Sequence, residues 1–594
     1  MKRWLLKRSK INTSAMAKEL GIRDAVACAL ANRGLAERRQ AYTFLYGTTE
    51  ALREASLMKD MALGVELIVR EIRAQKKIAV YGDYDVDGVM STTILYQAIL
   101  KCGGKAVYYV PHRQKEGYGL NLQAIEALAK EGVEVLLTCD NGIAALEEIK
   151  KAKALGMTVV ILDHHEPGFL TNNDKEQDIL PPADAVIDPK QRECTYPFPM
   201  LCAGGLAYKF ALKLLSAFAI TDAALEKEFL CFAAIATVCD IVDLLDENRI
   251  LVQWGLKEIP NTTNVGLQAL LEETGIAGKT ITEYHLGFII GPCINATGRL
   301  ESGEKAVALF CQQDQAKAKI IAKTLVSLNE ERKGFTAQGA ERAIHRLEEG
   351  TLLGDKVLVL YDEETHESIA GIVAGRLKER YYRPVILITK SEEGAKGSGR
   401  SIEGYHLFQA LFSCKELFTR FGGHAMAAGL SLPAENIPLL QKRLNDACQL
   451  TSEQMTPALR LDKQLKFSEI DLELAKQLRA LSPFGKENPA PVFASKSIHV
   501  DRVDLIGKNK DILRMTLSEN GIRLPALSFD GYGNLLKILK ELYPDEDCVK
   551  MLSCGQIDPL LDFAYSIEIN HYNGRNSVQL MIKDFRLSKN KEEQ

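Results

Sequence analysis

The chain has 594 residues, of which 46% are apolar and 26% charged, so it has the composition of a globular protein but is too long for a single core. Its net charge of −4 neither indicates nor excludes nucleic-acid binding, because such binding depends on local clusters of charge. No apolar stretch approaches the roughly 20 residues of a membrane span, and the apolar run in the basic start MKRWLLKRSK is too short for a secretory signal. We therefore expect no membrane association.

The cysteines favour a cytoplasmic protein. There are 13 of them, scattered and without a CxxC pair. An odd number without regular spacing argues against a disulfide framework and for a reducing compartment.

The first half of the chain predicts a helical start and then an α/β domain. Residues 1–60 show loose helical periodicity. From about residue 75, short apolar runs alternate with helical segments, which predicts a parallel sheet covered on both faces. The expected strands are 78–81, 106–110, 133–139, 158–162 and 185–187. A helical region follows from about 202, and its charged, proline-free end predicts one long helix over 315–350 that connects two domains.

The second half predicts two further domains. Strand and helix signals resume over 351–452, together with the glycine-rich stretches KGSGRS and FGGHAMAAG, and indicate a smaller α/β domain. Short apolar segments separated by turn residues over 453–587 predict a β-barrel of the OB type. Residues 588–594 are expected to be a frayed tail.

Acidic and imidazole groups follow several of the apolar runs in the first α/β domain. The stretch YGDYDVDG places Asp83, Asp85 and Asp87 after one run, and Asp140, Asp163-His164-His165 and Asp240 follow three others. We take all four runs as strands, whose carboxyl ends would meet at one edge of the sheet. Carboxylates gathered so densely repel one another unless cations lie between them, and oxygen ligands with one or two imidazoles suit manganese or magnesium. The pattern predicts a two-metal phosphoesterase, although any single Asp after a strand is often only a helix N-cap.

These motifs resemble a known family. GDYDVDG, CDNG, DHH and the Asp of TVCDIVDLL, in this order, are the motif set of the DHH phosphoesterase superfamily. PHRQKEGYGL, GPCINATGRL, GSGRS, GGHAMAAG and SPFGKENPAPVF are similar to the RecJ family of bacterial single-strand-specific exonucleases. The resemblance identifies 61–314 as the DHH catalytic domain, 351–452 as the DHH-associated domain and 453–587 as the OB domain. It implies hydrolysis of single-stranded DNA from 5′ to 3′ into 5′-mononucleotides, in DNA recombination and repair.

The resemblance also implies a role for each matching residue. Asp85, helped by Asp83, would bind a first manganese or magnesium ion, and Asp140 would bridge it to a second. The second ion would be bound by Asp87, His164 and Asp240. His165 would face the scissile phosphate. Two positions depart from the family pattern: Tyr81 stands where some relatives have a histidine, and Cys293 where an arginine is expected.

An exonuclease also needs a site that recognises the strand end. The resemblance implies that the terminal 5′ phosphate is bound by Arg113, Arg299, Ser398 and Arg400, and that His424 lies along the same groove as a further contact to substrate phosphate. Arginine forks suit phosphate, and neighbouring glycines let backbone N–H groups approach it. A surface salt bridge is the alternative for each arginine, and a capped tight turn is the alternative for the histidine.

Two other functions fit parts of the pattern. The first is a DHH phosphodiesterase that acts on short oligonucleotides or cyclic dinucleotides. The second is a non-catalytic scaffold that binds single-stranded DNA during replication, against which the intact acidic and DHH positions argue. The resemblance further implies single-strand-binding protein and a helicase as partners, and we expect a monomer.

Overall fold

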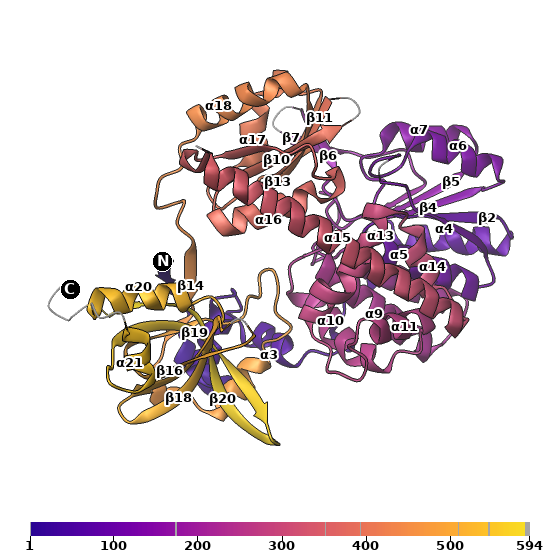
Figure 1. Ribbon diagram of the computed structural model, residues 1–594. Coiled ribbons are helices and arrows are strands. Elements are labelled where there is room, and N and C mark those ends of the chain that lie inside the picture. The colour runs from indigo at the N-terminus through magenta and orange to yellow at the C-terminus, as the bar shows by residue number, and fades with distance from the viewer. Residues whose placement is uncertain are drawn as a thin grey trace. The chain divides into compact units, whose positions relative to one another are not determined.

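The computed structural model describes residues 2–113, 115–172, 175–350, 352–391, 394–508, 510–543 and 547–588 (Figure 1). Contacts divide the chain into two compact units, which we describe separately: residues 48–451, and residues 1–47 together with 452–594. Of the tail expected at 588–594, all but Ser588 lies outside the described residues. No described helix is both long enough and apolar enough to cross a membrane.

The catalytic domain is built on a five-stranded parallel sheet in the order β3-β2-β4-β5-β8. Its strands are β2 (Lys77–Tyr81), β3 (Lys105–Tyr109), β4 (Val135–Cys139), β5 (Thr158–Leu162) and β8 (Ala185–Ile187). The chain runs from β2 outward to β3 and then returns to the other side of β2 for β4. The strand order therefore reverses between β2 and β4, and ligands bind at such a switch point beyond the carboxyl ends of the strands.

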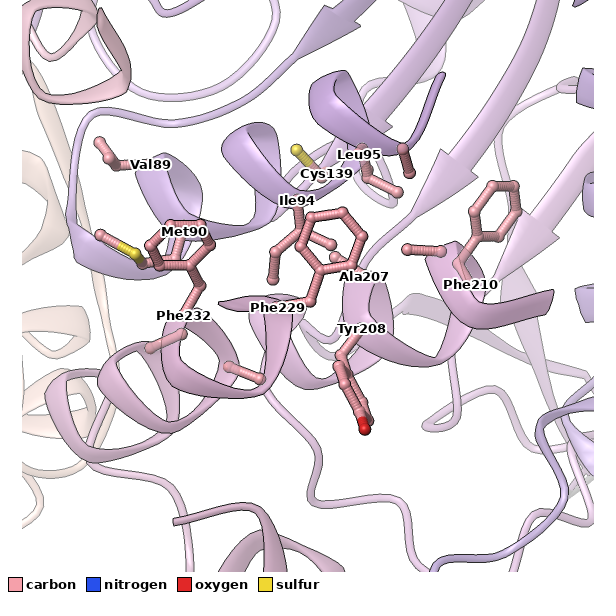
Figure 2. Close-up of a cluster of buried hydrophobic side chains, with 14 of the residues drawn as sticks. Val89, Met90, Ile94, Leu95, Cys139, Ala207, Tyr208, Phe210, Phe229 and Phe232 are labelled. Atoms are coloured by element: carbon pink, nitrogen blue, oxygen red, sulfur yellow. The ribbon is translucent and has the colours of Figure 1, made fainter. Parts of the chain in front are cut away.

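Helices cover both faces of this sheet, as the alternating βα pattern predicts. One face packs against α4 (Met61–Arg73), α5 (Val86–Lys101), α8 (Ala203–Ala217) and α9 (Ala223–Cys239). Figure 2 shows Phe229 and Phe232 of α9 turned toward Met90 and Ile94 of α5 in this core. The other face packs against α6 (Leu122–Lys130) and α7 (Leu146–Ala154). Because both faces are buried, the central strands are continuously apolar instead of alternating.

A helical layer completes the domain and leads into the long helix. Its members are α10 (Asp246–Glu258), α11 (Val265–Glu273), α12 (Glu283–His285), α13 (Gly291–Leu300) and α14 (Glu304–Phe310). A hairpin of β6 (Gly168–Asn172) and β7 (Lys175–Ile179) follows β5. The predicted long helix is α15 (Gln315–Glu349), whose N-cap Asp314 accepts hydrogen bonds from the first-turn amides. It packs against α11 and α13 along its first part and against α16 (Glu367–Tyr381) farther along.

The smaller α/β domain has a mixed sheet in the order β12-β13-β11-β10-β9. Its strands are β9 (Leu358–Tyr361), β10 (Val385–Ser391), β11 (Gly394–Arg400), β12 (Arg420–Gly423) and β13 (Ala427–Leu432). Its other helices are α17 (Leu407–Phe412) and α18 (Ile437–Ala447). Along β11, Ala395, Gly397 and Gly399 face the sheet's core, whereas Ser398 and Arg400 face the opposite side and are partly exposed.

The OB domain is a barrel in the second unit. Its strands are β16 (Phe493–Ile506), β17 (Ile512–Glu519), β18 (Ile522–Ser528), β19 (Leu560–Tyr572) and β20 (Arg575–Leu587). They pair in the order β16-β17-β18-β20-β19, and β19 pairs again with β16 to close the barrel. The short β15 (Lys463–Gln464) extends the edge of β16. Helices α19 (Leu472–Arg479), α20 (Tyr532–Leu542) and α21 (Cys548–Ser553) accompany the barrel.

The N-terminal segment differs from the helical prediction for 1–60 at its start. Helices α1 (Thr13–Leu20), α2 (Asp24–Ala31) and α3 (Arg38–Tyr46) are present, but β1 (Arg3–Leu6) is a strand that pairs in parallel with β14 (Ala458–Leu461). The Trp4 indole donates to Asp584 (2.8 Å), and the Arg586 guanidinium lies 4.4 Å from the Trp4 ring. The strand depends on partners more than 450 residues away, which local periodicity cannot reveal.

Candidate metal centre and phosphate pocket

The turn between β2 and α5 and the first turn of that helix hold three aspartates. Asp85 is the N-cap of α5, and its Oδ1 accepts the Gly88 amide at 3.1 Å, so the capping role considered above is real but uses one oxygen only. Asp83 is buried, and its Oδ1 has no hydrogen-bond partner among the described residues. Gly88 is required because a Cβ there would lie 2.5 Å from the Asp83 carbonyl oxygen. The turn thus leaves carboxylate oxygens available at the sheet edge.

Asp87 is held against the start of α8. Its two oxygens accept the amides of Ala203 (2.8 Å) and Gly204 (2.7 Å), where the helix terminus is electropositive. A Cβ on Gly204 would lie 2.4 Å from that of Ala236, so a glycine allows this close packing. Burial, followed by the charge of Asp85, raises the pKa of Asp87 to about 7. The carboxyl is therefore held in a fixed orientation, but its ionised form is unfavourable unless a cation lies beside it.

Asp140 directly follows β4 and has a strained backbone conformation. Its φ is +63°, which is uncommon for a residue other than glycine and is typical of functional sites. Burial, followed by the charges of Asp87 and Asp85, raises its pKa well above the usual range. Its Oδ1 lies 3.1 Å from Nε2 of His164.

His164 and Asp240 complete the cluster. His164 Nε2 is 3.6 Å from Asp87 Oδ2, and its Nδ1 is 3.8 Å from Asp240 Oδ2. Burial, followed by the neighbouring His165, lowers the pKa of His164 to about 3, so the imidazole is neutral, as a metal ligand must be. Burial and then Asp87 raise the pKa of Asp240 to about 8.

The prediction of a strand before Asp240 is wrong. The apolar run Ala233–Cys239 is the last part of α9, and Asp240 is the C-cap of that helix. A helix buried on nearly all sides lacks amphipathic periodicity, so a short apolar run within it cannot be told from a buried strand.

His165 is held by Asp163, to which sequence reasoning assigned no role. His165 Nδ1 lies 2.7 Å from Asp163 Oδ1, while Asp163 Oδ2 accepts the Ile143 amide at 2.9 Å. Burial alone would raise the pKa of Asp163, but the hydrogen bond and charge of His165 and the hydrogen bond from the Ile143 amide together outweigh it, and the pKa is lowered. Burial likewise opposes protonation of His165, yet Asp163 raises the pKa of His165 to about 9. His165 is therefore cationic at neutral pH, and 43% of its side chain is exposed.

Ligand atoms in this region form three groups, each with all atoms within 4.8 Å of one another. The groups are Asp83–Asp85–Asp140, Asp87–His164–Asp240 and Asp140–His164–His165. Asp140 and His164 link the groups to one another. Four carboxyls with raised pKa values and an unpartnered buried oxygen form a donor set that fits two adjoining divalent cations.

Three of the predicted phosphate ligands gather beside this cluster. The Arg113 guanidinium lies 5.1 Å from the Tyr84 ring, and Arg299 donates to the Ser368 carbonyl at 2.6 Å. Burial, followed by the charge of Arg113, lowers the pKa of Arg299 to about 10. The same two causes lower the pKa of Arg400. A group of guanidiniums in which the charge of Arg113 helps to lower the pKa values of Arg299 and Arg400 is suited to an anion.

Ser398 and His424 differ in their placement. Ser398 and Arg113 line the same cavity, of about 250 Å³, between the catalytic and the smaller α/β domain. His424 lies at the exposed turn between β12 and β13, where its amide donates to the Ala427 carbonyl at 2.8 Å. It is not among the residues that line that cavity.

The two residues that depart from the family pattern are both hydrogen-bonded within the protein. The Tyr81 hydroxyl donates to the Gly119 carbonyl at 3.3 Å. Cys293 is buried, and its Sγ accepts from Asn329 at 3.5 Å. Arg332 of α15, which sequence reasoning missed because no motif contains it, is close enough to Cys293 and Arg299 to interact with both. It places a positive charge near Cys293, where an arginine was expected.

Comparisons with known proteins agree with this architecture. The chain matches the DHH family N-terminal domain over residues 77–237, the DHHA1 domain over 354–450 and the RecJ OB domain over 461–584. It is 34% identical to the single-stranded-DNA-specific exonuclease RecJ of Bacillus subtilis (strain 168), over 99% of this chain and 71% of that protein. A crystal structure of RecJ from Thermus thermophilus with Mn²⁺ has the same fold, with a TM-score of 0.79, 24% identity and coverage of 99% of this chain and 80% of that one. A structure of exonuclease RecJ bound to manganese is 30% identical, with a TM-score of 0.58 over 68% of this chain and 97% of that one. The chain belongs to the RecJ family.

Proposed function

We propose that the protein is a hydrolase that degrades single-stranded DNA from 5′ to 3′ and releases 5′-mononucleotides, in DNA recombination and repair. The observation that carries the proposal is the linked carboxylate and imidazole cluster, with three arginines beside it. The first arrangement suits metal-assisted hydrolysis of a phosphodiester, and the second suits an anionic strand end. Relatives named as single-stranded-DNA-specific exonucleases support the choice of substrate.

The metals of this site are two divalent cations, manganese or magnesium. Asp83 and Asp85 would hold the first, Asp87, His164 and Asp240 the second, and Asp140 would bridge them. When bound, two such cations neutralise charge on the phosphate and lower the pKa of the attacking water. The manganese-bound relative at 30% identity supports this assignment.

The residues of the chain orient and stabilise the substrate. His165, held as a cation by Asp163, would donate a hydrogen bond to a non-bridging oxygen of the scissile phosphate, where negative charge accumulates. Arg113, Arg299, Arg400 and Ser398 would bind the terminal 5′ phosphate, and His424 would contact the strand nearby. Binding the end at a set distance from the metals would release one nucleotide at a time.

The domain boundaries and partners belong to the same proposal. We divide the chain into the catalytic domain (61–314), the connecting helix (315–350), the associated domain (351–452) and the OB domain (453–587), a division that the matched family regions support. Single-strand-binding protein and a helicase would be its partners. The protein would act as a monomer in the cytoplasm, where the thirteen unpaired thiols stay reduced.

The test is a digestion series with manganese and with chelator. Oligonucleotides labelled at the 5′ end would be supplied as single strands, blunt duplexes and 5′-tailed duplexes, alongside dinucleotides and cyclic dinucleotides. The proposal expects manganese-dependent release of labelled mononucleotide from single strands and 5′ tails. Faster hydrolysis of the dinucleotides would contradict it.

A further inference from the structure

Tyr118 lies against the exposed histidine of the centre, on the loop between β3 and α6. Its hydroxyl is 3.1 Å from Nε2 of His165 and donates to the Asp140 carbonyl oxygen, also at 3.1 Å. Its ring meets the His165 ring edge-on, with centroids 5.9 Å apart, and the Tyr84 ring similarly at 6.4 Å. The Tyr118 side chain itself is more than half exposed, so packing alone does not explain its position.

The donors in this chain of hydrogen bonds can be assigned. A main-chain carbonyl oxygen can only accept, so the single hydroxyl proton of Tyr118 is directed at Asp140. The hydroxyl oxygen must then accept from His165 Nε2–H. On the other side of the ring, His165 Nδ1–H donates to Asp163 Oδ1 at 2.7 Å. With both nitrogens engaged as donors, neither has a lone pair available for a metal ion.

We propose that Tyr118 is a positioning residue for His165: together with Asp163 it sets the ring orientation, so that Nε2–H is directed at a phosphate oxygen when substrate binds. The inference rests on the proposed hydrolysis of a phosphodiester. It separates the two histidines of the DHH motif, since His164 lies among carboxylates whereas both ring nitrogens of His165 are held as donors. An arriving phosphate oxygen would share the Nε2–H with the Tyr118 hydroxyl, which therefore still orients the ring in the complex.

The test is a double-mutant cycle on the full-length, manganese-loaded protein. Tyr118→Phe keeps the ring and removes the hydroxyl, and loss of one orienting hydrogen bond is expected to lower kcat about tenfold with KM changed less than about twofold. In a His165→Ala background the same change should have no further effect on kcat, because the group it positions is gone. Tyr208→Phe, which removes a hydroxyl from α8 outside the centre, is the matched control and should leave both constants unchanged.

The outcomes separate this inference from the proposed function. If the unmodified protein cleaves single-stranded DNA and Tyr118→Phe retains its full kcat, the positioning role is wrong and the function stands. Equal losses in the presence and absence of His165 would also overturn it, because the hydroxyl would then act elsewhere. A weaker Mn²⁺ affinity in Tyr118→Phe that accounts for the lost activity would assign its effect to Asp140 and contradict the inference. No manganese-dependent cleavage by the unmodified protein would refute the proposed function itself.

Discussion

Loading the centre with Mn²⁺ should release protons, because its carboxyls are partly protonated without metal and must ionise to bind it. With pKa values of about 7 for Asp87 and about 8 for Asp240, these groups hold about 0.5 and about 0.9 of a proton at pH 7. These two carboxyls should therefore lose about 1.4 protons at pH 7 and about 0.3 at pH 8.5, and Asp83 and Asp140, whose pKa values are also raised, add to that release. Because the metal competes with these protons, its affinity should rise as pH increases from 6.5 to 8.5.

Calorimetric titration of the metal-free protein with Mn²⁺, in two buffers of different ionisation enthalpy, measures the number of protons released. Asp240→Asn removes one of the titrating carboxyls and should lower the release at pH 7 by about 0.9 of a proton. A release near zero at pH 7, or one that does not change with pH, would refute the reasoning. The carboxyls would then be fully ionised beside one another before the metal arrives.

Four further predictions concern single residues. Asp140→Ala should lower manganese-dependent cleavage by about 10³-fold or more while circular dichroism stays that of the unmodified protein, and retained activity would argue against the shared ligand. Arg400→Ala should raise KM about tenfold for 5′-phosphorylated strands and much less for 5′-hydroxyl strands, whereas equal effects would contradict end recognition. Gly371→Ala should also raise KM for 5′-phosphorylated strands, because its Cβ would lie 2.6 Å from Arg400 Nη2. Gly375→Ala on the same helix is the control and should leave KM unchanged, because its Cβ would have no atom within 4 Å. An equal rise of KM in Gly375→Ala would point to a general effect on the helix. Trp4→Ala should lower the free energy of unfolding of the OB-containing unit by about 2 kcal/mol in chemical denaturation, and an unchanged midpoint would show that the indole contributes little.

The sequence predicts the parts of the fold that depend on local pattern. The runs before Asp83, Asp140 and Asp163 are short, apolar and bounded by polar residues, and the structure confirms each as a buried parallel strand. The structure also confirms the long connecting helix and the closed OB barrel. Both were predictable from the sequence, because a long proline-free stretch and a series of short strands separated by turn residues are local patterns. Convergence of the aspartates follows from the rule that parallel strands end at one edge.

What the sequence cannot predict depends on distant partners. Asp240 reaches the cluster from the end of a buried helix, because apolar residues on all sides of α9 hide its period. The strand β1 exists because β14 pairs with it, and no local signal marks either partner. Roles for Arg332 and Tyr118 could not be predicted either, because they follow from the spatial neighbours of these residues, Arg299 and His165 respectively.

The central claim is that two cations lie between carboxylates at the carboxyl edge of the first sheet. Anomalous scattering from a crystal soaked in Mn²⁺ tests it most directly. Two adjoining peaks are expected, one among Asp83, Asp85 and Asp140 and one among Asp87, His164 and Asp240, with Asp140 in contact with both. Peaks at other places, or these side chains turned away from any bound ion, would contradict the account.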